Sequence, residues 1–290
     1  MKIIKNIDEM KTHVKAWKNE GLSIGLVPTM GYLHDGHESL IRKSKNQNDK
    51  VVVSIFVNPT QFGENEDLST YPRDIGRDSE ICENLNVDIV FTPSSEEIYG
   101  ERFSTFIEVK DLSKELCGKS RPIHFRGVCT IVNKLFNIIT PDKAYFGEKD
   151  AQQLAIIKRM VKDLNIDIDI IGCPIVREAD GLAKSSRNSY LTEKERIAAR
   201  ILNESLKEAK DMILSGELSS EYIIHCISNK IKAEPLAKID YINIVNGESM
   251  EPVNIVENNT LIAIAVFIGN TRLIDNFTYS SNKKENILCY

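Results

Sequence analysis

The stretch from Gly25 to His37 constrains the fold of this chain more than any other part of its sequence. Residues 22–27 form a short, mostly apolar run that predicts a buried strand, and Pro28 is expected to end it because proline has no N–H to donate. From residue 37 onward, apolar residues recur at helical spacing. The unit is therefore expected to be a strand, a loop with two glycines and a helix, with His34 and His37 at the helix start.

A helix that starts directly after such a loop is a potential anion site. Its first N–H groups are unpaired and its dipole is positive at that end. The imidazoles of His34 and His37 can donate hydrogen bonds to phosphate oxygens as negative charge builds on them. Taken alone, the H-x-G-H motif is equally compatible with a tight strand-to-helix turn that carries two surface histidines. Motifs later in the chain favour the phosphate interpretation.

Strands and helices alternate along the first 175 residues. Besides the strand at 22–27, strands are expected at 50–57, 87–92, 142–147 and 166–172, and helices at 7–18, 72–85, 124–139 and 150–164. This alternation predicts an α/β fold, a Rossmann-like parallel sheet with helices on both faces. In such a sheet, ligands bind beyond the carboxyl ends of the strands.

The pattern changes after about residue 176. A long charged helix is expected at 192–213, with Thr192 as its N-cap and Glu195 completing a capping box. A helix at 219–232 and strands at 239–245, 261–268 and 271–277 follow. The sequence therefore predicts two domains, a Rossmann-like domain of residues 1–175 and a smaller α+β C-terminal domain of residues 176–290.

The composition excludes several classes of protein. A formal net charge of −5 and a pI near 5.7 argue against a general affinity for nucleic acid or anionic membranes. No apolar run is long enough to span a bilayer, and the N-terminus lacks the apolar segment of a signal peptide. The six cysteines never approach C-x-x-C spacing, so reduced thiols are expected rather than a disulfide or a zinc site. The expected location is cytoplasmic.

Polar residues cluster where the expected strands end. Gln61 offers both a donor and an acceptor, which suits a substrate with hydroxyl and carboxylate groups. Lys149 can meet a phosphate as a point charge, and Gln153 lies one turn into the helix that follows. Because parallel strands end at one edge, these residues and the two histidines are expected to share one crevice. Each cluster alone also suits a surface turn or a helix cap, and His124 either starts a helix or lines the crevice.

A further polar stretch lies beyond the expected domain boundary. Residues 184–187 read K-S-S-R, which places a lysine, two hydroxyls and an arginine together as phosphate donors. A solvated basic loop would have the same composition.

Several motifs together carry a resemblance to known families. H-x-G-H after the first strand, with K-S-S-R some 150 residues later, resembles the nucleotidyltransferase superfamily that includes class I aminoacyl-tRNA synthetases. More narrowly, the chain resembles the pantothenate synthetase (pantoate–β-alanine ligase) family over about residues 3–277. The motifs, in the family's order, are P-T-M-G-Y-L-H-D-G-H, S-I-F-V-N-P-T-Q-F, Y-P-R-D, R-P-I-H-F-R-G-V, F-G-E-K-D-A-Q-Q-L and D-G-L-A-K-S-S-R-N-S-Y-L-T.

The resemblance implies an AMP-forming ligase of pantothenate and coenzyme A biosynthesis. ATP and (R)-pantoate would give a bound pantoyl adenylate and pyrophosphate, and β-alanine would then attack the adenylate to release pantothenate and AMP. Mg²⁺ would accompany ATP through phosphate oxygens, with little protein ligation. The resemblance also implies a homodimer, and neither nucleic acid nor membrane is an expected partner.

The resemblance further implies roles for individual residues. The catalytic set would be His37, His34, Lys149, Ser185 and Arg187, with His37 as a proton donor. Gln61 and Gln153 would bind pantoate in the first domain, and Gln61 would also lie near β-alanine. The ATP-binding set would be Met30, Gly31, Tyr32, Leu33, His34, Asp35, Gly36, His37, Gly147, Glu148, Lys149, Asp150, Val176, Lys184, Ser185, Ser186 and Arg187.

Two positions depart from the family pattern near the expected pantoate region. Thr60 stands where many relatives have a bulkier apolar residue, and Cys117-Gly-Lys-Ser replaces a more usual acidic and small sequence. Their effect on substrate affinity is left open. The loop 180–188 contains Gly181, and its donors have no obvious partner without ATP. It is therefore expected to be a mobile lid that closes over the triphosphate and excludes water.

Two other functions stay open on the sequence alone. Another H-x-G-H adenylyl- or cytidylyltransferase would share the first half of the sheet, but Gln61, Gln153 and the K-S-S-R loop argue against it. A non-catalytic module whose histidines only sense ATP would bind the nucleotide without forming AMP.

Overall fold

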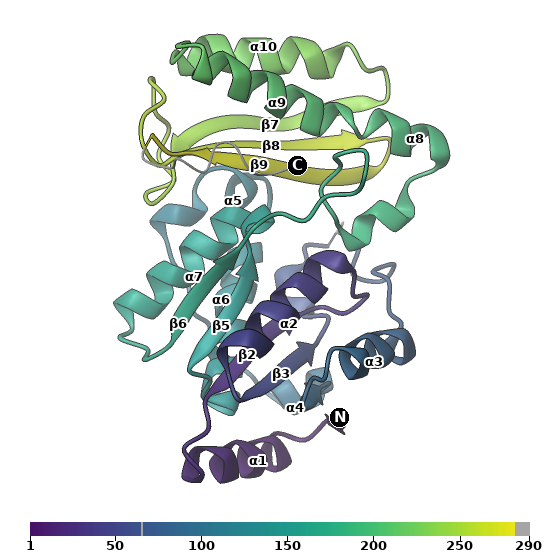
Figure 1. The fold of residues 1–290 in the computed structure, drawn as a ribbon, viewed down its shortest axis with the longest axis vertical. Helices are drawn as coiled ribbons and strands as arrows, with labels where there is room; N and C mark the ends of the chain where they lie inside the picture. Colours follow the sequence, from purple (N-terminus) through teal and green to yellow (C-terminus); the bar gives the residue numbers. More distant parts are fainter. Residues whose placement is uncertain (65, 282–290) are drawn as a thin grey trace. The chain divides into compact units, whose positions relative to one another are not determined.

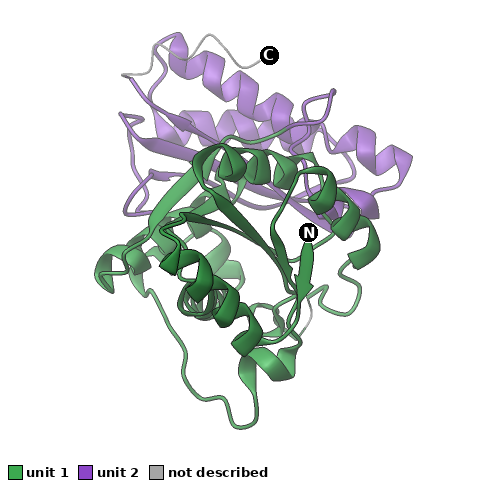
Figure 2. Cartoon of the chain, turned by 60° about the horizontal axis from the view of Figure 1, so that its bottom comes forward, with its two compact units in different colours: residues 1–176 green, residues 177–290 purple. Residues whose placement is uncertain are grey.

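The computed structural model of the chain describes residues 1–64 and 66–281. The chain divides into two compact units, residues 1–176 and 177–290, which Figure 2 colours separately. The observed boundary lies one residue beyond the expected one. The functions assigned to the two domains stay predictions, and each unit is described by itself.

The first unit is built on a six-stranded sheet in the order β1-β4-β3-β2-β5-β6, in which every pair of neighbours is parallel (Figure 1). The strands are Lys2–Ile4 (β1), Ile24–Thr29 (β2), Lys50–Ile55 (β3), Ile89–Phe91 (β4), Lys143–Gly147 (β5) and Asp169–Cys173 (β6). The predicted Rossmann-like parallel sheet is confirmed. Strand β1 was not predicted, because three residues carry too little pattern to separate a strand from a loop.

Helices cover both faces of this sheet because its central strands are apolar throughout. The helices are Ile7–Asn19 (α1), Asp35–Gln47 (α2), Ile75–Asn84 (α3), Ser95–Tyr99 (α4), Cys117–Ser120 (α5), His124–Ile139 (α6) and Ala151–Asp163 (α7), with short 3₁₀ turns at Pro59–Gln61 (η1), Asp111–Ser113 (η2) and Glu148–Asp150 (η3). Helices α2 and α3 share one buried cluster with β2, β3 and β4. Helix α6 contacts α1, α7 and β2. Right-handed crossovers place α1, α6 and α7 on the opposite face of the sheet.

The chain reverses its direction across the sheet at β2. Strands β3 and β4 lie to one side of β2, whereas β5 and β6 lie to the other. Ligands bind at such a switch point, beyond the carboxyl ends of the strands. The loops after β2, β3 and β5 carry the polar clusters that contain His34, Gln61 and Lys149, and the structure places all three loops at this edge.

Several predicted boundaries in the first unit are wrong. Strand β2 runs through Pro28 to Thr29, since β5 pairs with β2 only at Gly25 and Leu26 and a proline is tolerated where one side of a strand is unpaired. Helix α3 starts at Ile75 rather than residue 72, because the Asp74 carboxylate accepts from the N–H of Arg77 at 3.0 Å and caps it. Strand β6 starts at residue 169 rather than 166.

The second unit is a three-stranded antiparallel sheet with helices packed on it, so the predicted smaller α+β domain is confirmed. Its strands are Ala237–Asn246 (β7), Thr260–Ile268 (β8) and Thr271–Tyr279 (β9), and its helices are Glu193–Ala198 (α8), Ile201–Leu214 (α9) and Ser220–Lys232 (α10), with a 3₁₀ segment at Ser186–Tyr190 (η4). Alternate residues of β8, from Ile262 to Ile268, pack with the apolar faces of α9 and α10. None of the helices in residues 1–64 and 66–281 has the length and apolarity needed to cross a membrane.

The single helix predicted at 192–213 is divided into α8 and α9. Thr192 and Glu195 do form the predicted capping box. Around Ala199, however, the N–H groups of Arg200 and Leu202 bond to carbonyls three residues earlier, both at 3.2 Å, which tightens the turn and interrupts the α-helix.

Candidate active site

The loop between β2 and α2 is held by a carboxylate that the sequence analysis did not identify. Asp78 of α3 is 1% exposed and accepts from the backbone N–H groups of Tyr32 and Leu33, each at 2.7 Å. Burial raises the pKa of Asp78, although the two N–H donors act in the opposite direction. Gly31 has φ +84°, and a Cβ there would lie 2.9 Å from Asp78 Oδ2. The loop therefore needs glycine at 31 and a carboxylate at 78.

Two histidines at the start of helix α2 accept hydrogen bonds from backbone N–H groups, which fixes where each ring carries its hydrogen. The Nδ1 atom of His34 accepts from the N–H of Gly36 at 3.1 Å, and Nδ1 of His37 accepts from the N–H of His34 at 3.3 Å. A neutral imidazole that accepts at Nδ1 carries its hydrogen on Nε2. The two rings lie 4.1 Å apart between centroids. Both rings therefore present an Nε2–H donor at the start of a helix.

The surroundings of His37 keep its ring neutral. The pKa of His37 is lowered well below 6.5, first by burial and then by the neighbouring His34. Lys149 also lowers this pKa, whereas Asp150 raises it. In the turn after β5, Lys149 Nζ lies 3.9 Å from Oδ2 of Asp150. The charges of Lys149 and Asp150 therefore act on His37, so the loop after β5 lies close to the H-x-G-H loop, as predicted.

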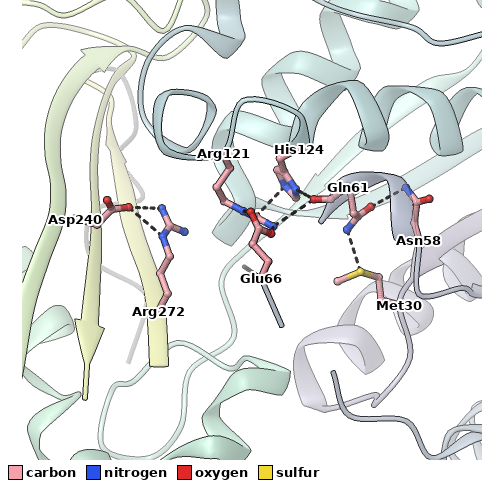
Figure 3. A network of polar contacts seen from close by, with 8 residues as sticks. All are labelled: Met30, Asn58, Gln61, Glu66, Arg121, His124, Asp240 and Arg272. Atoms are coloured by element: carbon pink, nitrogen blue, oxygen red, sulfur yellow. Dashed lines mark hydrogen bonds and ion pairs between the residues drawn. The ribbon is translucent and has the colours of Figure 1, made fainter. Parts of the chain in front are cut away.

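Gln61 ends the turn η1 and is 7% exposed (Figure 3). Its Oε1 accepts from Asn58 Nδ2 at 3.1 Å, and its Nε2 donates to Met30 Sδ at 3.0 Å. Gln61 thereby joins the loop after β3 to the loop after β2. Helix α6 packs closely against η1, because a Cβ at Gly127 would lie 2.4 Å from the carbonyl oxygen of Thr60.

His124 has a defined position beside Gln61, which resolves one alternative left open by the sequence. Its Nδ1 lies 3.0 Å from the carbonyl oxygen of Gln61, and Arg121 lies 3.3 Å from its Nε2 (Figure 3). Since a guanidinium only donates, Nε2 accepts and Nδ1 carries the hydrogen. Burial and the Arg121 charge lower the pKa of His124 to about 4. His124 therefore starts α6 and also holds the main chain of Gln61.

Arg121 forms an ion pair with Glu66 that closes this group. The guanidinium donates through Nε at 3.0 Å and through a second nitrogen to the other carboxylate oxygen. Burial raises the pKa of Glu66, but the hydrogen bond and charge of Arg121 outweigh this effect and lower it. A half-buried, bidentate pair of this kind fixes the orientation of both side chains.

The two glutamines of α7 have different surroundings. Gln152 is 6% exposed and donates to the carbonyl oxygens of Leu112 and Glu115, both at 2.8 Å, so it supports the segment before α5. Gln153, the predicted pantoate ligand, is half-buried on the next face of the helix. Gly147, Glu148, Lys149 and Asp150 form the turn between β5 and α7, and Val176 is the last residue of the first unit.

In the second unit, the K-S-S-R residues lie on a loop with many internal contacts. Arg177 donates to both carboxylate oxygens of the buried Asp275, at 2.7 and 3.0 Å, and to the carbonyl oxygen of Gly181 at 3.0 Å. Lys184 Nζ lies 3.0 Å from a carboxylate oxygen of Glu178. The expectation that the donors of this loop lack partners without ATP is therefore wrong for Lys184. The closure of this loop over ATP stays a prediction.

The remaining K-S-S-R residues form the start of η4. Ser185 is the N-cap and its Oγ accepts from the N–H of Arg187 at 3.3 Å, while Ser186 is 7% exposed. The side chain of Asn188 donates to the carbonyl oxygen of Ala183 at 3.1 Å. Hydrogen bonds within the loop therefore fix the backbone that carries the K-S-S-R side chains.

Sequence reasoning missed the residues that hold the site rather than face a ligand. Asn58, Asp78, Tyr99 and Arg121 were not singled out, because a carboxylate on a helix or a tyrosine before a glycine has no pattern of its own. Asn58 and Arg121 lie in the motifs N-P-T-Q and R-P-I-H-F-R-G-V, but these motifs drew attention to Gln61 and His124 instead.

Comparisons with known proteins find similar sequences along nearly the whole chain. The family model for Pantoate-beta-alanine ligase matches residues 2–278. A pantothenate synthetase from Enterococcus faecalis (strain ATCC 700802 / V583) is 62% identical over 279 residues, which cover 96% of this chain and 99% of the relative. A pantothenate synthetase from Clostridioides difficile (strain 630) is 59% identical over 280 residues, covering 97% of this chain and 99% of the relative.

Solved structures show the same similarity. A pantothenate synthetase from Thermus thermophilus matches with a TM-score of 0.90 at 38% identity, over 96% of this chain and 99% of that one. The pantoate-beta-alanine ligase from Francisella tularensis, complexed with beta-gamma ATP and beta-alanine, matches with a TM-score of 0.80 at 40% identity, over 96% of this chain and 97% of that one.

Proposed function

This chain belongs to the pantoate–β-alanine ligase family, and from that premise we propose how its residues share the work of the reaction. The enzyme catalyses the ATP-dependent condensation of pantoate with β-alanine to pantothenate. Pantoate is first adenylated with release of pyrophosphate, and β-alanine then displaces AMP. No comparison favours another H-x-G-H transferase.

The two neutral imidazoles at the start of α2 carry the assignment of the ATP site. Each carries an Nε2–H donor while its Nδ1 accepts a backbone hydrogen bond. In the transition state of adenylation the attacked phosphorus is pentacoordinate and negative charge gathers on its oxygens. Hydrogen-bond donors that are already in place stabilise that charge. His34 and His37 are assigned this role, with Lys149 adding a positive charge beside them. The rest of the loop from Met30 to Gly36 is assigned to ATP as well.

Gln61 and Gln153 are assigned to pantoate. Gln61 has an amide that is fixed by protein contacts and retains further hydrogen-bonding capacity, which suits a hydroxy acid. Gln153 lies on the helix that begins beside Lys149, so it can reach the same ligand as the phosphate donors. The relative from Francisella tularensis, complexed with beta-alanine, supports a β-alanine site in the same family.

Mg²⁺ is proposed to enter as part of the nucleotide substrate, MgATP. Within residues 1–64 and 66–281, no group of three or more His, Cys, Asp or Glu side chains could hold a metal ion. Mg²⁺ on a nucleotide needs only one or two carboxylates besides phosphate oxygens and water. The exposed carboxylates of Glu148 and Asp150, beside Lys149, fit that need. The ion would neutralise charge on the departing pyrophosphate.

The contributions of the second unit are carried over from the family resemblance. Lys184, Ser185, Ser186 and Arg187 are assigned to the phosphates of ATP, and Val176 to the nucleotide as well. Ser185 and Arg187 would act on the reacting phosphate. The same resemblance supports a homodimer in the cytoplasm, with small molecules as the substrates.

An AMP-release assay with single omissions tests the function. AMP should form only when ATP, pantoate and β-alanine are all present, whereas isotope exchange between pyrophosphate and ATP should need pantoate but not β-alanine. Pyrophosphate release that depends on a nucleoside monophosphate instead of pantoate would indicate another transferase. ATP binding without AMP formation from any of these mixtures would indicate a binding module.

A further inference from the structure

Asn58, to which neither ATP nor pantoate is assigned, lies at the centre of a hydrogen-bonded group. It is 1% exposed. Its Nδ2 donates to the carbonyl oxygen of Gly127 at 3.1 Å. The same nitrogen donates to Oε1 of Gln61, also at 3.1 Å (Figure 3). Its Oδ1 accepts from Thr60 Oγ1 at 3.0 Å and from the hydroxyl of Tyr99. Every hydrogen-bonding atom of this amide therefore has a partner.

The carbonyl oxygen of Gly127 determines which way the amide of Asn58 faces. A carbonyl only accepts, so the NH₂ group must point toward it and Oδ1 must point toward the two hydroxyls. The second hydrogen of that NH₂ group then requires an acceptor, which makes Oε1 the atom of Gln61 that faces Asn58. The NH₂ group of Gln61 is left on the other side, where Met30 Sδ is its partner at 3.0 Å. Sulfur is a weak acceptor that a substrate oxygen can replace.

The hydroxyl of Tyr99 is held in place by its own surroundings. The ring centroid of Tyr99 lies 4.8 Å from that of Phe103 and 6.2 Å from that of Phe56. Burial raises the pKa of Tyr99, so its hydroxyl keeps its hydrogen at neutral pH. Thr60 Oγ1 lies 3.0 Å from the same hydroxyl. The two hydroxyls thus form a fixed pair behind Asn58.

We propose that Tyr99 and Thr60 are positioning residues that set the specificity for pantoate, by orienting Asn58 and through it the amide of Gln61. The inference rests on the proposed function, in which Gln61 binds pantoate. Tyr99 and Thr60 themselves contact no substrate. Thr60, which departs from the family pattern, contributes a hydroxyl that an apolar residue would lack.

The double substitution Tyr99→Phe with Thr60→Val tests this inference, since it removes both hydroxyls at nearly constant volume. Oδ1 of Asn58 is then buried without a donor, and the amides of Asn58 and Gln61 lose their fixed orientation. The KM for pantoate should rise roughly 10- to 100-fold, while the KM for ATP changes less than about twofold. Preference for pantoate over analogues that lack one hydroxyl group should fall by a similar factor.

A matched control separates this effect from the loss of any buried tyrosine hydroxyl. Tyr145 of β5 is fully buried, and its hydroxyl donates to Gln47 at 2.9 Å and accepts from Asn48 at 2.8 Å. Tyr145→Phe should leave both the KM for pantoate and the preference over deoxy analogues unchanged. If the double variant does not fold, Tyr99→Phe alone should give an intermediate rise, because Thr60 still donates to Asn58.

Gln61→Ala distinguishes failure of this inference from failure of the proposed function. An unchanged KM for pantoate in Gln61→Ala would remove the substrate role of Gln61, and the inference with it. A raised KM in Gln61→Ala, together with an unchanged KM in the double variant, would overturn the positioning role alone. Equal losses of kcat/KM for pantoate and its deoxy analogues in the double variant would indicate a purely structural role.

Discussion

Hydrogen placement at single residues decides the chemistry of the proposed phosphate site. His34 and His37 both accept at Nδ1 from the backbone at the start of α2, so each is neutral and carries its one hydrogen on Nε2. The lowered pKa of His37, caused by burial and by His34, keeps that state. Two donors are therefore available without a proton transfer before each turnover.

Substituting either histidine should reduce adenylation sharply. His34→Ala and His37→Ala should each lower the rate of ATP–pyrophosphate exchange by roughly 100- to 1,000-fold, the usual loss for one donor fixed before the reaction. His13→Ala should leave the rate unchanged, since His13 lies on α1 and contacts Lys2 at 2.8 Å. Near-wild-type exchange in both site variants would exclude the phosphate role.

The N-cap role of His34 needs a separate variant. Asparagine is a favourable N-cap, so His34→Asn should keep the stability of α2 while it removes the imidazole donor. Thermal unfolding close to that of the wild type, combined with slow exchange, is the expected result. Loss of stability and activity in parallel would show that His34 acts mainly as a cap.

At the scale of elements, the contact between α6 and η1 transmits the position of a buried helix to Gln61. Gly127→Ala introduces a methyl group at 2.4 Å from the carbonyl oxygen of Thr60 and 2.6 Å from Gln61 N and Cα. The turn η1 must move away, which disturbs the hydrogen bonds of Gln61. Because a buried polar group without its partner costs about 1–3 kcal/mol, the KM for pantoate should rise at least about tenfold. ATP binding should change little.

The alanine substitution has a matched control in Gly76 of α3, where the nearest atom to an added Cβ is at 3.6 Å. Gly76→Ala should leave the KM for pantoate unchanged. Equal effects of the two substitutions would show that the close approach at Gly127 has no functional consequence.

The loop of residues 177–188 is a second element whose behaviour can be measured. The ion pair between Arg177 and Asp275 fixes the first residue of this loop. Farther along, Oδ2 of Asp180 lies 2.7 Å from a guanidinium nitrogen of Arg196. If the loop still closes over ATP, nucleotide should slow amide hydrogen exchange in residues 180–188, and Lys184→Ala should reduce that protection. Equal exchange with and without ATP would make these residues a fixed wall of the site.

Helices and strands with strong sequence patterns were predictable, whereas the side chains that hold the loops of the site in place were not. The strand at β3 and the helix α6 follow directly from apolar runs and their periodicity. Gln61 and the two histidines were found because motifs place them just past strand ends. Asp78 and Tyr99 were missed, since each acts through a contact more than 40 residues away in sequence. No local pattern encodes such a contact.

At the scale of the whole molecule, two buried histidines make stability depend on pH. The pKa of His124 is lowered to about 4, mainly by burial, and that of His37 is lowered as well. Between pH 6.5 and the folded-state value, the unfolded chain binds more protons than the folded one, so stability falls as the pH falls. For His124 alone, the loss at pH 4 is on the order of 3 kcal/mol.

Urea unfolding at several pH values between 7 and 4 measures this dependence. The wild type should lose stability steadily below pH 6.5. His124→Gln keeps an amide donor for the carbonyl oxygen of Gln61 but does not titrate, so its stability should fall less steeply. Identical slopes for the two proteins would show that folding leaves the pKa of His124 unchanged.

The two units follow one another in the chain instead of interleaving, and this order matters during synthesis. Every strand of the parallel sheet, from β1 to β6, has left the ribosome before translation reaches the last strands of the second unit. At 5–20 residues per second, the roughly 110 residues of the second unit take about 6 to 20 s to make. That interval exceeds the folding time of most single domains. The nascent first unit can therefore assemble Gln61, Asn58 and both histidines while the ribosome is still translating the rest.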